Sequence, residues 1–258
     1  MRPGRWPLIG GLAALVIALP LADAPLMLGL RGVGYAVCHQ IPSHSLFIAG
    51  QQLPLCARCT GIYLGFLVGL LGLALLGKLS ASRLPPRPIT LLLLLALLAM
   101  AVDGLNSLLG FFPDAPQAYQ PSNLLRLATG MAAGSSLALI LVPLMNEALW
   151  AKPAAWESVS DLGELGGYAV LVALATVLVD AEHPALLYPI AIASVAGVFL
   201  ALSMAGTALA ATLLAPRGGL ASSPAEAGRA ALGGFALAAI AMVALGEARA
   251  YLSPLLGV

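Results

Sequence analysis

Long apolar runs separated by short polar links dominate this chain. Seven runs come close to or exceed about 20 residues, the length that an α-helix needs to cross a bilayer. Their approximate bounds are 7–30, 61–79, 89–109, 124–150, 162–179, 186–214 and 227–251. The first run is interrupted by Pro20, Asp23 and Pro25, and the last contains Glu247 and Arg249. The pattern therefore predicts six to seven transmembrane helices.

No segment competes as a strand, so we predict an all-α, polytopic helix bundle that forms one integral membrane domain over residues 1–258. The composition agrees, because 60% of the residues are hydrophobic and only 9% are charged, whereas a soluble domain carries roughly 25% charged residues. The lipid bilayer is therefore the expected surroundings. A net charge of +1 provides no basic field, so we expect no nucleic-acid partner.

Lysine and arginine in the links predict the orientation, because cytoplasmic links carry an excess of both. With the N-terminus inside, eight lie on the cytoplasmic side and four outside. The eight are Arg2, Arg5, Lys78, Arg83, Arg87, Lys152, Arg217 and Arg229, and the four are Arg31, Arg58, Arg126 and Arg249. We predict a multi-pass protein of the cell inner membrane whose first run is not cleaved as a signal peptide. The links after runs one and three then share the extracytoplasmic side.

All three cysteines fall in the link between the first two runs. Cys38 is followed by His39, and Cys56 and Cys59 form a Cys-x-x-Cys pair. Thiolate and imidazole are ligands that Zn²⁺ prefers, and four of them make a tetrahedral site. We therefore predict an extracytoplasmic zinc-type site from Cys38, His39, Cys56 and Cys59. His44 can replace His39 as a ligand or serve as a catalytic base.

Three other interpretations of the cysteines stay open. Cys56 and Cys59 can form a disulfide, because the loop is expected to face an oxidising compartment. They can also be a redox pair in which Arg58 lowers a thiol pKa, or small buried apolar residues. Sulfur separations decide, since a disulfide requires about 2.05 Å and sulfurs around one ion lie about 3.5–4 Å apart.

Polar residues at membrane depth mark a second candidate feature. Asp103 and Asn106 lie near the outer end of the third run, and Asn123 and Arg126 lie near the outer start of the fourth. Charges inside spans are costly and therefore indicate function. In one interpretation Asp103 and Arg126 form an ion pair between two spans. In the other they line a polar pocket in which Arg126 clamps a phosphate or carboxylate, Asp103 is an acid, base or metal ligand, and Asn106 and Asn123 contact the bound group.

A stripe of glycines predicts close helix packing. Gly61, Gly65, Gly69 and Gly72 recur on one face of the second run. Small residues let transmembrane helices approach closely, so we expect this face to meet another helix and not a nucleotide.

The segments CHQIP at 38–42 and LCARCTGIYLG at 55–65, with Gly50 between them, resemble a known signature. It is the CHQxP…CxRCTGxYxG pattern of an uncharacterised family of predicted bacterial and archaeal integral membrane proteins, domain of unknown function 2085. The segments DG at 103–104 and SNLLRLATG at 122–130 fit the same family. Where the family has an arginine after the proline, this chain has His44, which removes an anion-binding group and adds a possible ligand. The resemblance covers about 30–135, leaves 136–258 as a helical scaffold, and implies a membrane location without an established activity.

Three functions fit these residues. The one we favour is a membrane metalloprotein whose zinc site, beside the Asp/Arg pocket, acts on a lipid-linked or anionic small-molecule substrate if one coordination position stays open. The first alternative is a thiol–disulfide redox protein using Cys56 and Cys59. The second is a small-solute transporter.

Overall fold

The computed structural model describes residues 24–112, 115–215 and 219–256. Within these residues, six helices are long and apolar enough to cross a membrane. They are α3 (Ala57–Leu75), α4 (Arg87–Leu109), α5 (Asn123–Leu149), α6 (Leu162–Asp180), α7 (Leu187–Leu214), which the short η3 (Pro184–Leu186) precedes, and α8 (Pro224–Leu256). They confirm the predicted transmembrane bundle.

The first predicted run lies largely outside the described residues, and its end belongs to α2 (Ala24–Tyr35). In the described part of the chain, the cysteine-bearing segment therefore precedes the first candidate span, α3.

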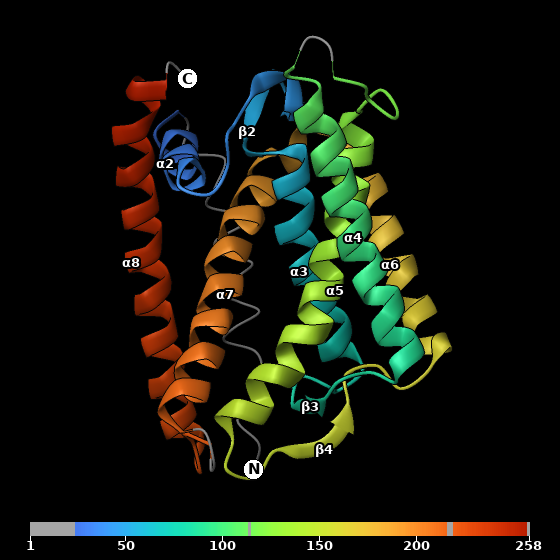
Figure 1. The fold of residues 1–258 in the computed structure, drawn as a ribbon, viewed down its shortest axis with the longest axis vertical. Coiled ribbons are helices and arrows are strands. Elements are labelled where there is room, and N and C mark those ends of the chain that lie inside the picture. Colours follow the sequence, from blue (N-terminus) through green and yellow to red (C-terminus); the bar gives the residue numbers. More distant parts are fainter. Residues whose placement is uncertain (1–23, 113–114, 216–218, 257–258) are drawn as a thin grey trace.

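The helices run side by side, with α3 and α5 in the middle, α7 and α8 toward one edge and α4 and α6 toward the other (Figure 1). The most extensive contact is between α3 and α5, and α5 is also the most buried of the candidate spans. Helix α7 packs on α3 and α5, and α8 packs mainly on α7. The two helices that carry the motif residues thus form the centre of the bundle.

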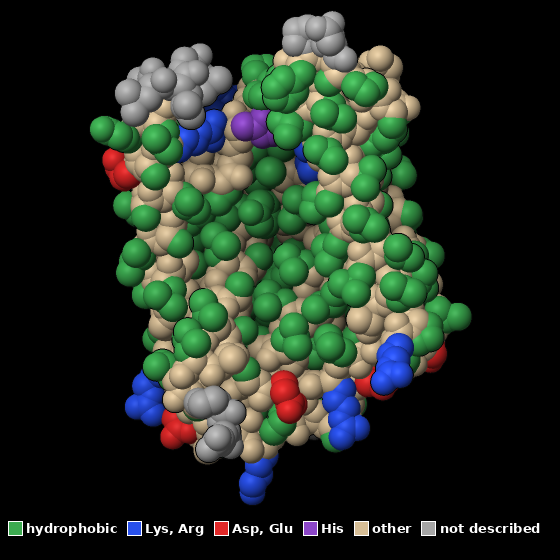
Figure 2. All heavy atoms as spheres, in the orientation of Figure 1, with side chains coloured by type: hydrophobic (Ala, Val, Ile, Leu, Met, Phe, Trp, Pro, Cys, Tyr) green, Lys and Arg blue, Asp and Glu red, His purple; other side chains and the backbone are tan. Residues whose placement is uncertain are grey.

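On the face of the molecule that Figure 2 shows, apolar side chains cover the middle and charged side chains gather at the two ends. On α4, Leu91, Leu95 and Leu98 are each about half exposed, at 58%, 48% and 57%. In water this exposure would be unfavourable, but in lipid it carries no penalty because acyl chains are equally apolar. The surface therefore fits a protein that spans a bilayer.

Glycines explain how closely α3 and α5 approach. A Cβ added to Gly65 would overlap the backbone of Met131 on α5, and one added to Gly134 would overlap the carbonyl of Ile62 on α3. Gly61 likewise lies against the α5 backbone. The predicted packing role of the glycine stripe is confirmed.

Two small sheets correct the expectation that no segment forms a strand. The strands are β1 (Ser45–Ile48), β2 (Gln51–Cys56), β3 (Ala81–Arg83) and β4 (Ala154–Glu157). The first two form an antiparallel hairpin, and its turn residues Ala49 and Gly50 have φ of 51° and 75°, as a two-residue primed turn requires. Strands this short give too little alternation to be recognised beside long apolar runs.

The β1–β2 hairpin, the one-turn helix η2 (Pro42–His44) and α2 lie at one end of the bundle, which we call the cysteine end. The starts of α3 and α5 are at this end, and Asn123 on α5 donates to the Ser45 carbonyl of β1 over 3.1 Å. The links before α3 and before α5 therefore meet, as predicted. The β3–β4 pair and the Lys78–Glu164 ion pair lie at the opposite end.

The α3–α5 contact can be tested with Gly65→Ala. We expect this variant to lose about 1–3 kcal/mol of stability or fail to fold, because overpacking against rigid backbone is destabilising. The matched control is Gly167→Ala on α6, where an added Cβ meets nothing within 4 Å; it should leave stability unchanged or raise it by up to about 1 kcal/mol. Thermal unfolding in detergent measures both, and equal losses would contradict the close approach.

Candidate metal centre

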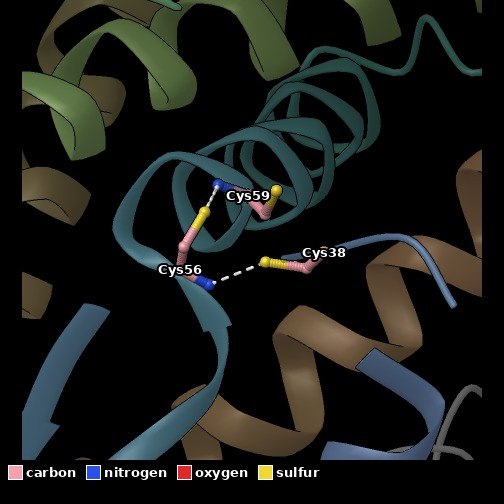
Figure 3. A group of neighbouring side chains, drawn as sticks. All are labelled: Cys38, Cys56 and Cys59. Carbon is pink, nitrogen blue, oxygen red and sulfur yellow. Dashed lines mark hydrogen bonds between the residues drawn. The ribbon is translucent and has the colours of Figure 1, made fainter. Parts of the chain in front are cut away.

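Three sulfur atoms converge at the cysteine end. The Sγ atoms of Cys38, Cys56 and Cys59 all lie within 4.8 Å of one another. Cys38 approaches from the loop after α2, while Cys56 ends β2 and Cys59 lies in the first turn of α3 (Figure 3). The thiols of Cys38 and Cys56 are buried, and that of Cys59 is half-buried. The predicted convergence of the sulfurs is confirmed.

The helix start explains why the Cys-x-x-Cys spacing brings two sulfurs together. Cys56 is the N-cap of α3, and its Sγ accepts the backbone N–H of Cys59 at 3.5 Å. Residues three apart share one side of the first helical turn. The Sγ of Cys38 also accepts a backbone hydrogen bond, from the N–H of Cys56 at 3.1 Å. Such N–H donors at a helix N-terminus stabilise thiolates.

Gln40 fastens the Cys38 loop to the hairpin. Its side-chain Nε2 donates to the backbone carbonyls of Arg31 at 2.8 Å and Pro54 at 2.7 Å. The backbone carbonyl of Gln40 accepts from Gln52 Nε2 at 2.9 Å. Gln40 has a φ of 55°, a left-handed conformation that turns the chain back after Cys38. These bonds fix the position of the first sulfur relative to β2.

Arg249 holds the same loop from the far end of the sequence. This α8 side chain donates from Nη1 to the carbonyls of Tyr35, at 2.6 Å, and Cys38, and from Nη2 to that of His39 at 3.1 Å. Its guanidinium also lies 4.0 Å from the centre of the Tyr35 ring, within cation–π range. The last helix therefore clamps the backbone that carries Cys38.

His39 lies beside the sulfurs, and His44 lies against His39. His39 Nδ1 is 4.0 Å from the Cys38 sulfur, but neither His39 nor His44 belongs to the group of mutually close ligand atoms. The His39 Nε2 atom lies 3.3 Å from His44 Nδ1. Of the four predicted ligands, the structure brings the three cysteines together and leaves His39 adjacent.

The local charges set the protonation of these groups. Hydrogen bonding to Cys56 and then Cys59 lowers the pKa of the Cys38 thiol far below its usual value, while burial opposes this. Hydrogen bonding to Cys38 and then Cys56 raises the pKa of His39 to about 9. Burial, followed by the positive charges of Arg126 and His39, lowers the pKa of His44 to about 4. Negative charge on the Cys38 sulfur is thus stabilised, and a bound dication would serve the same purpose.

The predicted Asp103–Arg126 ion pair is wrong, because Asp103 pairs with Arg58. Arg58 donates from Nε to Asp103 Oδ2 at 3.1 Å and forms a second, shorter bond to the same oxygen from Nη2. Nη2 also reaches Ser107 Oγ at 2.9 Å. The Asp103 side chain is only 1% exposed. Arg58 lies between the two cysteines of the motif in sequence, so this pair anchors the start of α3 to α4.

Arg126 is buried in the first turn of α5 at 5% exposure. Its Nη1 donates to Asn123 Oδ1 at 2.8 Å. Asn123 and Arg126 therefore share one face of α5, and among the described residues Arg126 forms no hydrogen bond to α4. Ser122 is the N-cap of α5 and accepts from the Leu125 N–H at 3.1 Å, a usual role for serine at a helix start.

Asn106 forms hydrogen bonds with the backbone of the link before α5. Its Nδ2 donates to the Tyr119 carbonyl at 2.9 Å, and its Oδ1 accepts from the Ala118 N–H at 2.8 Å. The Tyr119 hydroxyl in turn donates to Asp103 Oδ1 at 2.9 Å. The amide predicted to contact a bound group is thus occupied by the protein's own loop.

The residues that position the sulfurs were only partly visible in the sequence. Gln40 and Arg58 stand inside the two cysteine segments, so their proximity to the site was a usable signal. Arg249 lies 211 residues from Cys38, and no local pattern connects it to the loop.

Comparison with other proteins finds similarity in the part of the chain that contains the three cysteines. A family model described as "Predicted membrane protein (DUF2085)" matches residues 38–140, from Cys38 into α5. The "Uncharacterized protein MJ1492" of Methanocaldococcus jannaschii is 36% identical over 123 residues, which are 48% of this chain and 72% of that protein. An "Uncharacterized protein" of Methanothermobacter thermautotrophicus is 33% identical over 105 residues, 40% of this chain and 83% of its own length. No solved structure matches the chain.

The Arg58–Asp103 pair can be tested by single and double substitution. Arg58→Met and Asp103→Leu should each cost about 3–5 kcal/mol, because each leaves an uncompensated buried charge. The double variant should lose less than the sum of the two. Lys78→Met, in the more exposed pair at the opposite end, should cost at most about 1 kcal/mol. Thermal unfolding gives all four values, and strict additivity would refute the coupling.

The Arg249 clamp predicts a change in thiol accessibility. Arg249→Gln removes three bonds to the Cys38 loop, so we expect alkylation of the buried Cys38 by a maleimide to accelerate about tenfold, as about 1.4 kcal/mol of easier local opening would give. Peptide mass spectrometry follows each cysteine separately. Arg229→Gln, on an exposed position of the same helix, is the control, and equal rates in both variants would rule out the clamp.

Proposed function

This chain belongs to the family of predicted membrane proteins described as DUF2085, and from that premise we propose that it is a membrane metalloprotein that binds Zn²⁺ through Cys38, Cys56 and Cys59. The convergence of all three sulfurs within 4.8 Å is the observation that carries the proposal. Two segments 18 residues apart supply them, and thiolates select soft or borderline ions such as Zn²⁺.

The fourth coordination position gives this centre its chemistry. Three protein ligands with one open position are typical of catalytic zinc, whereas four protein ligands are typical of structural zinc. His39 lies beside the cluster and not within it, which favours the open arrangement. A zinc ion held in this way supplies a hydroxide at neutral pH or polarises a substrate oxygen. The proposed activity is hydrolysis or transfer on a lipid-linked or headgroup substrate.

The position of the sulfurs relative to the first candidate span supports this substrate class. They lie at the start of α3, and in this proposal that start lies at the level of lipid headgroups. Lys78 and Arg87 lie at the opposite end of the bundle, and such residues favour the cytoplasmic side. We propose that the cysteine end faces the extracytoplasmic side of the cell inner membrane.

Elemental analysis of the purified protein tests the metal. We expect about one zinc per chain in the wild type, and a loss of most of it in Cys56→Ser and Cys59→Ser, because two sulfurs cannot retain the ion. His39→Asn should keep near-stoichiometric zinc if the fourth position is open. His183→Asn, which changes the histidine in the link before α7, is its matched control. Chelation should also lower the unfolding temperature of the wild type.

A wild type without stoichiometric metal would end this proposal. So would a Cys56–Cys59 disulfide in protein purified without oxidant, since oxidised sulfurs cannot ligate zinc, and that result would favour the redox alternative. Alkylation before and after reduction, read by mass, detects it directly.

A further inference from the structure

Arg126 has a buried guanidinium group that forms no ion pair with a carboxylate among the described residues. Its side chain is 5% exposed, and among the described residues its one hydrogen bond is from Nη1 to Asn123. The Nε atom is buried and has no partner in the described part of the chain. In that same part, the two ion pairs are Arg58–Asp103 and Lys78–Glu164, so Arg126 belongs to neither.

Among the described residues, the carboxylate that acts on Arg126 is that of Asp103, and both of its oxygens already accept hydrogen bonds. Asp103 receives Arg58 on Oδ2 and the Tyr119 hydroxyl on Oδ1. The ionisable groups that act on Arg126 are Arg58 and Asp103, followed by Cys56 and Tyr119. Among the described residues, two guanidinium groups thus share the carboxylate of Asp103.

A buried charge of this kind is unfavourable unless an opposite charge joins it. The start of α5 adds to the same field, because a helix N-terminus carries partial positive charge and attracts anions. A planar guanidinium with free donors matches an oxyanion, which it binds with two parallel hydrogen bonds. The unused Nε donor, the second guanidinium beside a single carboxylate and the helix N-terminus all favour the same kind of ligand, an oxyanion.

We propose that Arg126 binds a phosphate-type oxyanion at the start of α5. Asn123 orients the guanidinium through the bond to Nη1, and it is held in turn by its own bond to the Ser45 carbonyl. The two residues before Arg126, Leu124 and Leu125, are exposed at 50% and 36%, so apolar surface lies next to the first turn of α5. A phospholipid headgroup and a soluble phosphate share the required chemistry. The site uses none of the sulfur atoms, so it stands whether or not zinc binds.

Inorganic phosphate added to delipidated protein in detergent tests the site. We expect saturating phosphate to raise the unfolding temperature of the wild type by about 3 °C or more, and to have no effect on Arg126→Gln. Arg126→Lys keeps the positive charge but cannot form the two parallel hydrogen bonds of a guanidinium, so it should respond at a higher phosphate concentration. Arg229→Gln, the matched arginine control on α8, should respond like the wild type.

A second experiment distinguishes a phospholipid headgroup from a soluble phosphate as the ligand. Native mass spectrometry from phosphatidylglycerol nanodiscs should show the wild type retaining the lipid at least about fivefold more than Arg126→Gln does, if the headgroup is the ligand. Retention without that difference, combined with a response to inorganic phosphate, assigns the site to a soluble phosphate. Neither response in the wild type, or equal responses in wild type and Arg126→Gln, overturns the proposal.

Two further measurements, the unfolding temperature without phosphate and the zinc content, distinguish loss of the anion site from loss of folding or of the metal. Arg126→Gln should unfold no earlier than the wild type without phosphate, because the substitution removes an uncompensated charge. If it does not fold, Arg126→Lys carries the test, and a response identical to that of the wild type then overturns the proposal. Zinc content should be equal in all variants. Loss of zinc together with the phosphate response would assign Arg126 a structural role and reject the anion site.

Discussion

The close packing of α3 on α5 is the constraint on which the rest of the structure depends. Glycines on both helices let their backbones touch, which places the first turns of the two helices next to each other at the cysteine end. One of these turns carries Cys59 and the other carries Arg126. A wider separation would move the first turn of α3, which carries Cys59, away from the polar residues of α5. Helix packing in the membrane centre thus sets the geometry of a site at its edge.

The charges at the cysteine end serve different purposes. Asp103 neutralises Arg58 and thereby fixes the turn between Cys56 and Cys59, so this pair is structural even though it lies among candidate functional groups. In the part of the chain that the structure describes, Arg126 has no such partner, and in our proposal its charge is available to a ligand. Intramembrane charges are functional candidates by default, but their partners decide which of them hold the fold and which remain for chemistry.

The second half of the chain contributes to the site despite its featureless sequence. The family match ends at residue 140, but α8 returns beside α2 and places Arg249 on the carbonyls around Cys38. The helical scaffold predicted for 136–258 therefore also positions a sulfur. A substitution far from the cysteine motif can in this way alter the motif itself.

The sequence by itself determined the membrane bundle, the ends of six helices within a few residues, the packing role of the α3 glycines and the identity of the three sulfurs. These features are local, because apolar length, small-residue spacing and cysteine spacing can each be read within one segment. Only the tertiary structure decided that Asp103 pairs with Arg58 and not Arg126, that His39 lies beside the sulfurs, and that Arg249 clamps their loop. Each of these depends on the rotation and depth of helices relative to one another. Long apolar helices leave that arrangement undetermined until their side chains pack.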